Sequence, residues 1–146
     1  MQVYEPTTIT KQYLKDLSHH DEMMKSGYRI AFFNIGKQLT RYTREIIKKG
    51  PKTGRLYYIA GRKKRHRASA AGEAPANLTG RLRKGVNFNV SGWDQMQFGD
   101  TVFYGKFLEE GTRKMKPRPH LSKSVDYNEA YAEQQLALEP LRAIQR

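Results

Sequence analysis

Histidines and carboxylates are the residues of this chain best able to hold a metal ion or to move a proton. The histidines are His19, His20, His66 and His120. Neighbouring side chains on a helix point in different directions, so the adjacent His19 and His20 make a poor metal site. Four carboxylates are the remaining candidates for a metal-nuclease cluster: Asp94, Asp100, Glu109 and Glu110. No lysine stands at matching spacing, and the adjacent Glu109 and Glu110 are typical of a solvated helix face.

The common sequence motifs of enzymes are absent as well. Gly36-Lys37 lacks the upstream glycine and the following serine or threonine of a phosphate-binding P-loop. No Gly-x-Ser-x-Gly motif occurs, and the chain has no cysteine, which excludes thiolate metal sites and thiol nucleophiles. We therefore expect no enzymatic activity, no cofactor and no metal ion.

Positive charge is the most unusual property of the chain. Its 146 residues include 27 lysines and arginines against 14 acidic residues, a net charge of +13. Residues 48–84 hold twelve basic residues and one acidic residue, so most of the excess lies in one quarter of the sequence. The densest run is Arg62-Lys63-Lys64-Arg65-His66-Arg67. Like charges this close repel one another, which predicts a solvated loop.

This basic segment has two interpretations. It could be a surface loop that charge keeps soluble, or a contact surface for phosphates or an acidic partner protein. The charge exceeds what solubility requires, which favours the contact surface. The candidate contact residues are Arg62, Lys63, Lys64, Arg65, Arg67, Arg81 and Arg83.

One long helix is the clearest element that the sequence predicts. The length of the chain indicates a single domain, residues 1–146, in which residues 1–20 form a lead-in segment. Ser18-His19-His20-Asp21 has the form of a capping box, and apolar residues then recur every three or four positions as far as about Lys49. Gly50-Pro51 should end this helix. No run of about 18 apolar residues occurs, so we expect no membrane span.

The second half of the chain predicts short strands and short helices. Residues 55–60 are β-prone, and residues 86–91 and 96–98 alternate apolar and polar side chains, which predicts an antiparallel hairpin that Val102-Phe103 extend. Residues 61–80 show neither period, and we expect a long basic loop that is mobile and orders on docking.

Two helices are predicted after the hairpin. Residues 104–110 should form a short helix that Gly111 stops. A further helix should start at Leu121 and bend or end at Pro140. The fold class is therefore α+β, a small antiparallel β-sheet packed against one long α-helix, with a short helix and a C-terminal helix.

Two stretches of the sequence resemble patterns of a known family. Residues 68–83 are similar to the pattern S-x-P-G-E-x-P-x-x-x-T-G-x-L. The matching residues are Gly72, Glu73, Pro75, Thr79, Gly80 and Leu82. The later segment is similar to the pattern Y-A-x-x-x-E-x-G-T followed by R-P-F. Its matching residues are Tyr104, Glu109, Gly111, Thr112, Arg118 and Pro119. Both patterns belong to the head–tail joining, or tail-completion, proteins of long-tailed phages. The chain departs from them at Ala71, where proline is usual, at Glu110, where an apolar residue is common, and at His120, where phenylalanine is usual.

The resemblance implies a structural virion protein of the phage neck, present in the host cytoplasm during assembly. It implies a homo-oligomeric ring, six-fold, that completes the tail and joins it to the DNA-filled head. The partners would be the adjoining head-completion or adaptor protein and a tail-terminator or tail-tube protein. The basic loop would dock on an acidic face of such a protein, with non-specific contact to DNA in the channel as the alternative. Arg118, between two prolines, would either form a bidentate salt bridge with Glu109 or remain exposed.

Two other functions remain open from the sequence. The tail terminator is another ring protein of the same neck and shares the α+β plan. A basic nucleic-acid-binding domain would also account for the charge, although the basic residues cluster on a loop rather than along a periodic helix face.

Overall fold

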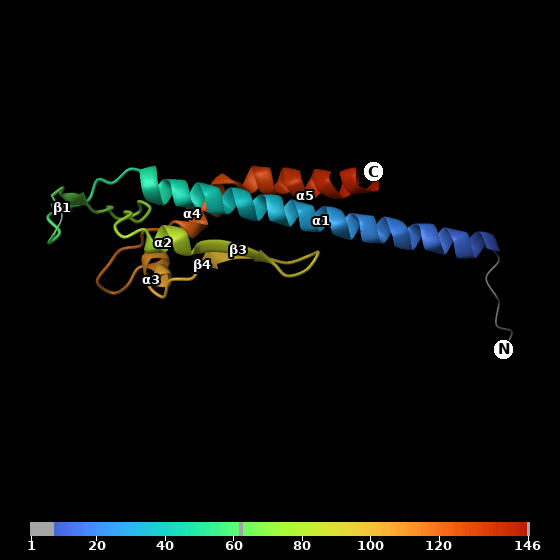
Figure 1. Ribbon diagram of the computed structural model, residues 1–146, viewed down its shortest axis with the longest axis horizontal. Coiled ribbons are helices and arrows are strands. Elements are labelled where there is room, and N and C mark those ends of the chain that lie inside the picture. Colours follow the sequence, from blue (N-terminus) through green and yellow to red (C-terminus); the bar gives the residue numbers. More distant parts are fainter. Residues whose placement is uncertain (1–7, 62, 146) are drawn as a thin grey trace.

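A single long helix organises the molecule. The computed structural model describes residues 8–61 and 63–145, with side chains from residue 15 onward. The elements in chain order are α1 (Thr8–Lys49), β1 (Leu56–Tyr57), β2 (His66–Arg67), α2 (Arg81–Gly85), β3 (Val86–Val90), β4 (Met96–Asp100), α3 (Gly105–Glu110), α4 (Leu121–Tyr127) and α5 (Glu129–Ile144). Figure 1 shows α1 as a spine with α5 along one side and the β3–β4 hairpin along another. This confirms the α+β class.

The helix α1 is longer than the sequence predicted. It ends at Lys49 as expected, and the Gly50 amide closes the last turn on the carbonyl oxygen of Ile46 at 3.0 Å. Its start at Ser18 was wrong, because the helix already runs from Thr8 through the predicted capping box. Ser18 Oγ instead donates to the carbonyl oxygen of Lys15 within the helix. The predicted lead-in is therefore helical from Thr8, and residues 1–7 lie outside the described part of the chain.

The strands form two separate antiparallel pairs. β3 pairs with β4 in a register that places Val86 opposite Asp100 and Phe88 opposite Phe98, which confirms the predicted hairpin. β1 pairs with β2, so the predicted strand over 55–60 is reduced to two residues and part of the predicted loop is itself a strand. The predicted extension at 102–103 is wrong, because the chain turns there toward α3.

The hairpin packs closely on the spine. The Phe88 ring lies over Gly36 of α1, where a Cβ atom would come within 2.2 Å of the ring. Phe33 meets Phe88 edge to face, with ring centroids 5.5 Å apart. Near the end of α1, Ile47, Leu82 and Val86 form a buried cluster. Partly buried side chains from β4, α3 and the turn between them complete it: Phe98, Val102, Tyr104 and Leu108.

The C-terminal helix predicted from Leu121 is two helices that meet at Asn128. The buried Asn128 side chain donates to the carbonyl oxygen of Ser124 at 2.7 Å and accepts from Gln38 of α1 at 3.2 Å. The second of these helices, α5, runs antiparallel to α1, and Asn34 donates to Gln135 farther along the same interface. None of the described helices is long and apolar enough to cross a membrane.

Pro140 does not end α5, which excludes one of the two predicted outcomes, an end or a bend at this residue. The helix continues to Ile144, with Glu139 and Pro140 buried against α1. The contact is possible because α1 carries glycine at position 27, where a Cβ atom would lie 2.5 Å from the Cα atom of Pro140. Close packing at Gly27 therefore holds the last turns of α5 on the spine.

Replacing Gly27 by alanine should destabilise the protein by about 1–2 kcal/mol. A methyl group meeting backbone atoms costs about 1–3 kcal/mol, which outweighs the gain of up to about 1 kcal/mol in helix propensity. Urea denaturation would measure the difference. Ser26→Ala, at the exposed neighbouring position, is the matched control and should be neutral or slightly stabilising. A Gly27→Ala variant as stable as the control would contradict this packing.

Candidate partner-binding site

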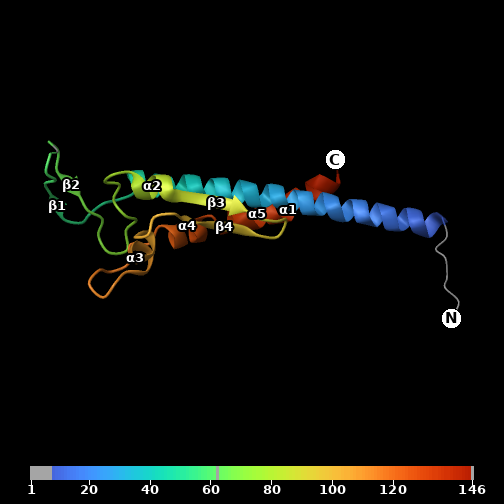
Figure 2. The same ribbon diagram turned by 60° about the horizontal axis from the view of Figure 1, so that its bottom comes forward.

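The basic residues are carried on a projecting arm. We define the basic arm as residues 56–67, which are β1, β2 and the segment between them. Figures 1 and 2 both show the arm beyond the end of α1, at the opposite end of the molecule from the first turn of that helix. Lys63, Lys64 and Arg65 are exposed near its tip. The Arg65 guanidinium carbon lies 4.7 Å from the centre of the Tyr58 ring, a cation–π contact on an aromatic side chain that is 68% exposed.

The other predicted contact residues are spread over the base of this arm. Arg67 donates to the carbonyl oxygen of Gly54 at 3.3 Å. Arg81 is exposed at the start of α2, and Arg83 in the same helix is half-buried. Arg62 lies outside the described residues. The structure thus brings most of the predicted cations to one end of the molecule.

Residues 68–80 are held in place by Glu73, the only acidic residue in the basic quarter of the chain. Its carboxylate accepts from the Ala70 amide at 2.7 Å, the Thr53 amide at 2.9 Å and the Thr53 hydroxyl at 2.5 Å. Hydrogen bonds from the Thr53 side chain and from these two amides lower the pKa of Glu73 to about 2. The residue at the centre of the first motif therefore ties the loop to the chain that follows α1.

Further contacts fix the same segment. Lys52 Nζ donates to the carbonyl oxygen of Ala74 at 2.8 Å, and Lys123 of α4 donates to that of Gly72. The Gly72 amide in turn donates to the carbonyl oxygen of Pro117 at 2.9 Å. Residues 68–80 contain no helix or strand, as predicted for a loop, and these contacts fix part of its path. That the loop is mobile before docking stays a prediction. Its backbone groups are paired with side chains far away in the sequence, and no local period signals such pairing.

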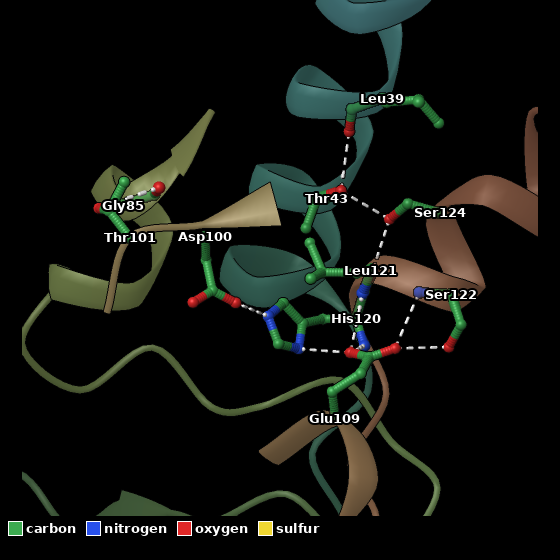
Figure 3. Close-up of polar contacts among 10 residues, drawn as sticks. All are labelled: Leu39, Thr43, Gly85, Asp100, Thr101, Glu109, His120, Leu121, Ser122 and Ser124. Carbon is green, nitrogen blue, oxygen red and sulfur yellow. Dashed lines mark hydrogen bonds and ion pairs between the residues drawn. The ribbon is translucent and has the colours of Figure 1, made fainter. Parts of the chain in front are cut away.

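Glu109 organises the second motif, as Figure 3 shows. One carboxylate oxygen accepts from the amides of His120 and Leu121 at 2.8 and 3.0 Å. The other accepts from the amide and hydroxyl of Ser122 at 2.8 and 2.6 Å. These amides open α4, whose own first residues supply no side-chain cap. Glu109 of α3 thus caps the start of α4 from a different element.

His120 lies fully buried between two carboxylates. Its Nδ1 is 3.0 Å from Glu109 and its Nε2 is 3.0 Å from Asp100 at the end of β4. Burial acts to lower the pKa of His120, but the hydrogen bonds to Glu109 and Asp100 outweigh it and raise the pKa. Burial likewise acts against ionisation of Glu109, and its bonds from His120 and Ser122 hold the pKa of that carboxyl well below its usual range. A protonated imidazole donates from Nε2 to Asp100 and forms an ion pair with Glu109 through Nδ1, whose position does not meet hydrogen-bond geometry, so the three groups form an ionic clasp.

The same clasp is joined to the spine by hydroxyl groups. Ser124 Oγ donates to the carbonyl oxygen of His120 at 2.6 Å, and Thr43 Oγ1 of α1 lies 2.7 Å from Ser124 Oγ. Both side chains are fully buried. The ring of His120 is closed off from solvent, and both of its nitrogens face acids, so no lone pair is directed at a metal ion. Across the described part of the chain, no cluster of three or more such ligands is suited to a metal ion.

Arg118 does not form the salt bridge with Glu109 that the sequence left open. The oxygens of Glu109 are occupied by the start of α4, and the Arg118 amide donates instead to the carbonyl oxygen of Leu108 at 2.7 Å. Arg118 is half-buried rather than exposed, so neither predicted arrangement is found. Its Nε atom is buried with no hydrogen-bond partner among the described residues.

The two motif stretches meet around one cavity of about 390 Å³. The arm contributes Tyr57 and His66, residues 68–82 contribute most of one wall, and Tyr104, Leu108 and Arg118 contribute the rest. Sequence reasoning missed this cavity, although it selected Pro75, Thr79, Gly80, Arg81, Leu82, Tyr104 and Arg118 among its lining residues. The resemblance was the only signal, because nothing local in the sequence places residues 40 positions apart on facing walls.

The remaining motif residues shape turns near this cavity. Gly72, Gly80 and Gly111 all have φ values near +80°, which side-chain-bearing residues rarely adopt. At Gly111 a Cβ atom would also lie 2.8 Å from the carbonyl oxygen of Met115. Thr112 pairs with Met115 in an isolated bridge, so the loop before Arg118 is a closed turn. Pro119 lies between Arg118 and the buried His120.

Comparison of the chain with models of known protein families, with curated proteins and with solved structures gave no match.

The clasp makes stability depend on pH on the alkaline side. Because the pKa of His120 is raised in the folded protein, protonated His120 stabilises the fold fully at pH values below its unfolded pKa of about 6.5. This stabilisation is lost as the pH rises through the pKa of His120 in the folded protein. Urea denaturation from pH 6 upward should show stability falling by at most about 1.4 kcal/mol per pH unit from this group. His120→Gln should remove that component, whereas His19→Gln on the exposed part of α1 should keep it. Equal pH profiles for wild type and His120→Gln would contradict the clasp.

Glu73→Gln should loosen residues 68–76 without unfolding the protein. The amide side chain loses the charge that three donors share, so hydrogen exchange at the Ala70 and Thr53 amides should accelerate. The pKa of Glu73 is lowered to about 2 in the folded protein, from about 4.5 in the unfolded chain. In the wild type, the protection of these amides against exchange should therefore persist above pH 4.5 and be lost as the pH falls toward 2. Hydrogen-exchange mass spectrometry measures both effects. Glu110→Gln, an exposed carboxylate in α3, is the control, and unchanged exchange in Glu73→Gln would refute the anchoring role.

Proposed function

We propose that this protein is a structural component of the neck of a long-tailed phage, where copies form a ring that completes the tail and joins it to the DNA-filled head. The observation that carries the proposal is the meeting of the two motif stretches. Residues 68–83 and 104–119 each resemble a pattern of the same family, and the two stretches lie together at the foot of the basic arm. Their proximity supports the proposal because both patterns then contribute to one part of the surface.

The chemistry of the matched residues supports the same proposal. Glu73 and Glu109 each fix a backbone segment, and the matched glycines occupy left-handed turns. These residues build a rigid support, and the fully buried His120 next to them is out of reach of a substrate. Such an arrangement is suited to holding a surface in shape during assembly.

The basic arm supplies the docking element of the proposal. It extends from the end of α1, and its exposed cations have no ion-pair partner in the described part of the molecule. A ring also requires contacts between different patches of successive subunits, and an arm on one end of an elongated subunit can reach a neighbour. We favour an acidic face of the adjoining neck or tail protein as its target, since a tight grip on DNA would hinder DNA exit.

Nucleic-acid binding is the second candidate, and the pair of Tyr58 and Arg65 favours it. An exposed aromatic ring beside cations can stack on an unpaired base. Fluorescence anisotropy with single-stranded and duplex DNA distinguishes the two functions, because binding at physiological salt with a steep salt dependence supports a nucleic-acid-binding domain. A tail-terminator role in the same neck is separated by testing whether purified protein binds isolated heads or isolated tails.

Deleting the gene from its phage should leave filled heads and unattached tails, and adding the purified protein to that extract should restore infectious particles. A second sample carries four changes to alanine, at Arg62, Lys63, Lys64 and Arg65. This variant should fold normally yet restore at least about tenfold fewer plaques. The binding energy of four desolvated cationic contacts far exceeds the roughly 1.4 kcal/mol that a tenfold change requires.

The matched control replaces exposed cations outside the basic segment: Lys15, Arg29, Lys37 and Lys106. It removes the same charge and should restore joining as wild type does. Normal particles from the deletion phage would overturn the proposed function. Full joining by the arm variant would overturn only the role of the arm.

A further inference from the structure

The cavity at the foot of the arm contains polar groups that the molecule leaves without partners. Ser69 is 2% exposed, and its Oγ has no hydrogen-bond partner in the part of the chain that the structure describes. The same holds for the buried Nε of Arg118. Both residues line the cavity of about 390 Å³. Buried polar atoms are normally paired, and both of these atoms are covered by neighbouring groups, so a ligand that moves those groups aside would gain two hydrogen-bond partners.

The charge of the lining shows what kind of group fits. No aspartate or glutamate lines the cavity, whereas Arg118 and Arg81 do, together with His66 from the arm. The Arg118 side chain also forms no ion pair with a described residue. A carboxylate accepts hydrogen bonds from arginine and hydroxyl donors such as these, which are partly or fully withdrawn from water. A ligand that fits is therefore an acceptor with negative charge.

Much of the remaining wall is apolar, although Asn77 and Thr79 also line the cavity. Pro75, Leu78, Leu82 and Leu108 form its apolar sides, and Tyr57 of the arm stands at its edge. A volume of about 390 Å³ lies at the small end of the range for ligand pockets. This favours a carboxylate on a short apolar stem, as in an acidic residue beside a leucine in a polypeptide.

We propose that this cavity is a docking pocket for an acidic segment of an adjoining protein subunit, with one carboxylate bound by Arg118 and Ser69. The neighbouring cations of the arm would attract the acidic residues that flank it. That the adjoining subunit belongs to a phage neck rests on the proposed function. The preference for a carboxylate rests on the pocket alone and is tested without any particle.

The test is an NMR titration of the isotope-labelled full-length protein with two blocked dipeptides. N-acetyl-leucyl-glutamate amide carries the carboxylate, and N-acetyl-leucyl-glutamine amide is its neutral isostere. The acidic peptide should cause saturable shifts at amides of residues 69, 78–82 and 118, with binding about fivefold tighter than for the neutral peptide. Equal binding of both peptides, or no shifts at the pocket, overturns the proposal.

Two pocket variants separate binding from a structural role. Ser69→Ala removes a hydroxyl that is unpaired in the free protein, so the melting temperature should stay the same or rise while binding of the acidic peptide weakens about threefold. Arg118→Gln should abolish the preference for the acidic peptide. Lys106→Gln, an exposed cation on α3 outside the cavity lining, is the control and should bind as wild type does. A lower melting temperature with unchanged binding in Ser69→Ala would show that Ser69 is structural and overturn its assignment.

The outcomes of this titration are separate from those of the joining experiment. Peptide discrimination without any joining defect in the deletion phage would retain the pocket and refute the neck function. A joining defect in the deletion phage without peptide discrimination would retain the neck function and refute the pocket.

Discussion

The second half of the molecule depends on the hydrogen bonds and the ion pair that the ionised carboxylate of Glu109 forms. It closes the start of α4, pairs with the buried His120 and thereby connects to Asp100 at the end of the hairpin. Through Ser124 and Thr43 the same group of residues is joined to α1. The elements α3, α4 and β4 are therefore connected to one another and to α1 through the charge of Glu109. Removing one partner would leave a buried charge unpaired, which is costly in a protein interior.

Glu73 performs a parallel task on the other side of the cavity. Like Glu109, it binds backbone amides and a hydroxyl rather than an arginine. A carboxylate used in this way sets the path of a loop, because its acceptors fix the direction of several amides at once. Both acids lie in the two motif stretches, so these motif residues shape the surface around the cavity by fixing backbone segments.

Elements built from local patterns could be predicted from the sequence, and those built from distant contacts could not. The end of α1 at Lys49, the β3–β4 hairpin and α3 followed from apolar periods, alternation and a stopping glycine. The capping-box pattern at Ser18 predicted the wrong start for α1, because residues 8–17 form helix equally well and nothing there breaks it. Pro140 was predicted to bend or end its helix, and it does not end it, because packing against Gly27 outweighs local preference. The role of Glu109 needed the position of α4, which no spacing supplies.

The length of α1 has a mechanical consequence. Its 42 residues span about 63 Å, and α5 and the hairpin lie along only the later part of that length. A helix resists stretching along its axis, so α1 acts as a ruler within the molecule and keeps the basic arm at a set separation from the first turn of the helix.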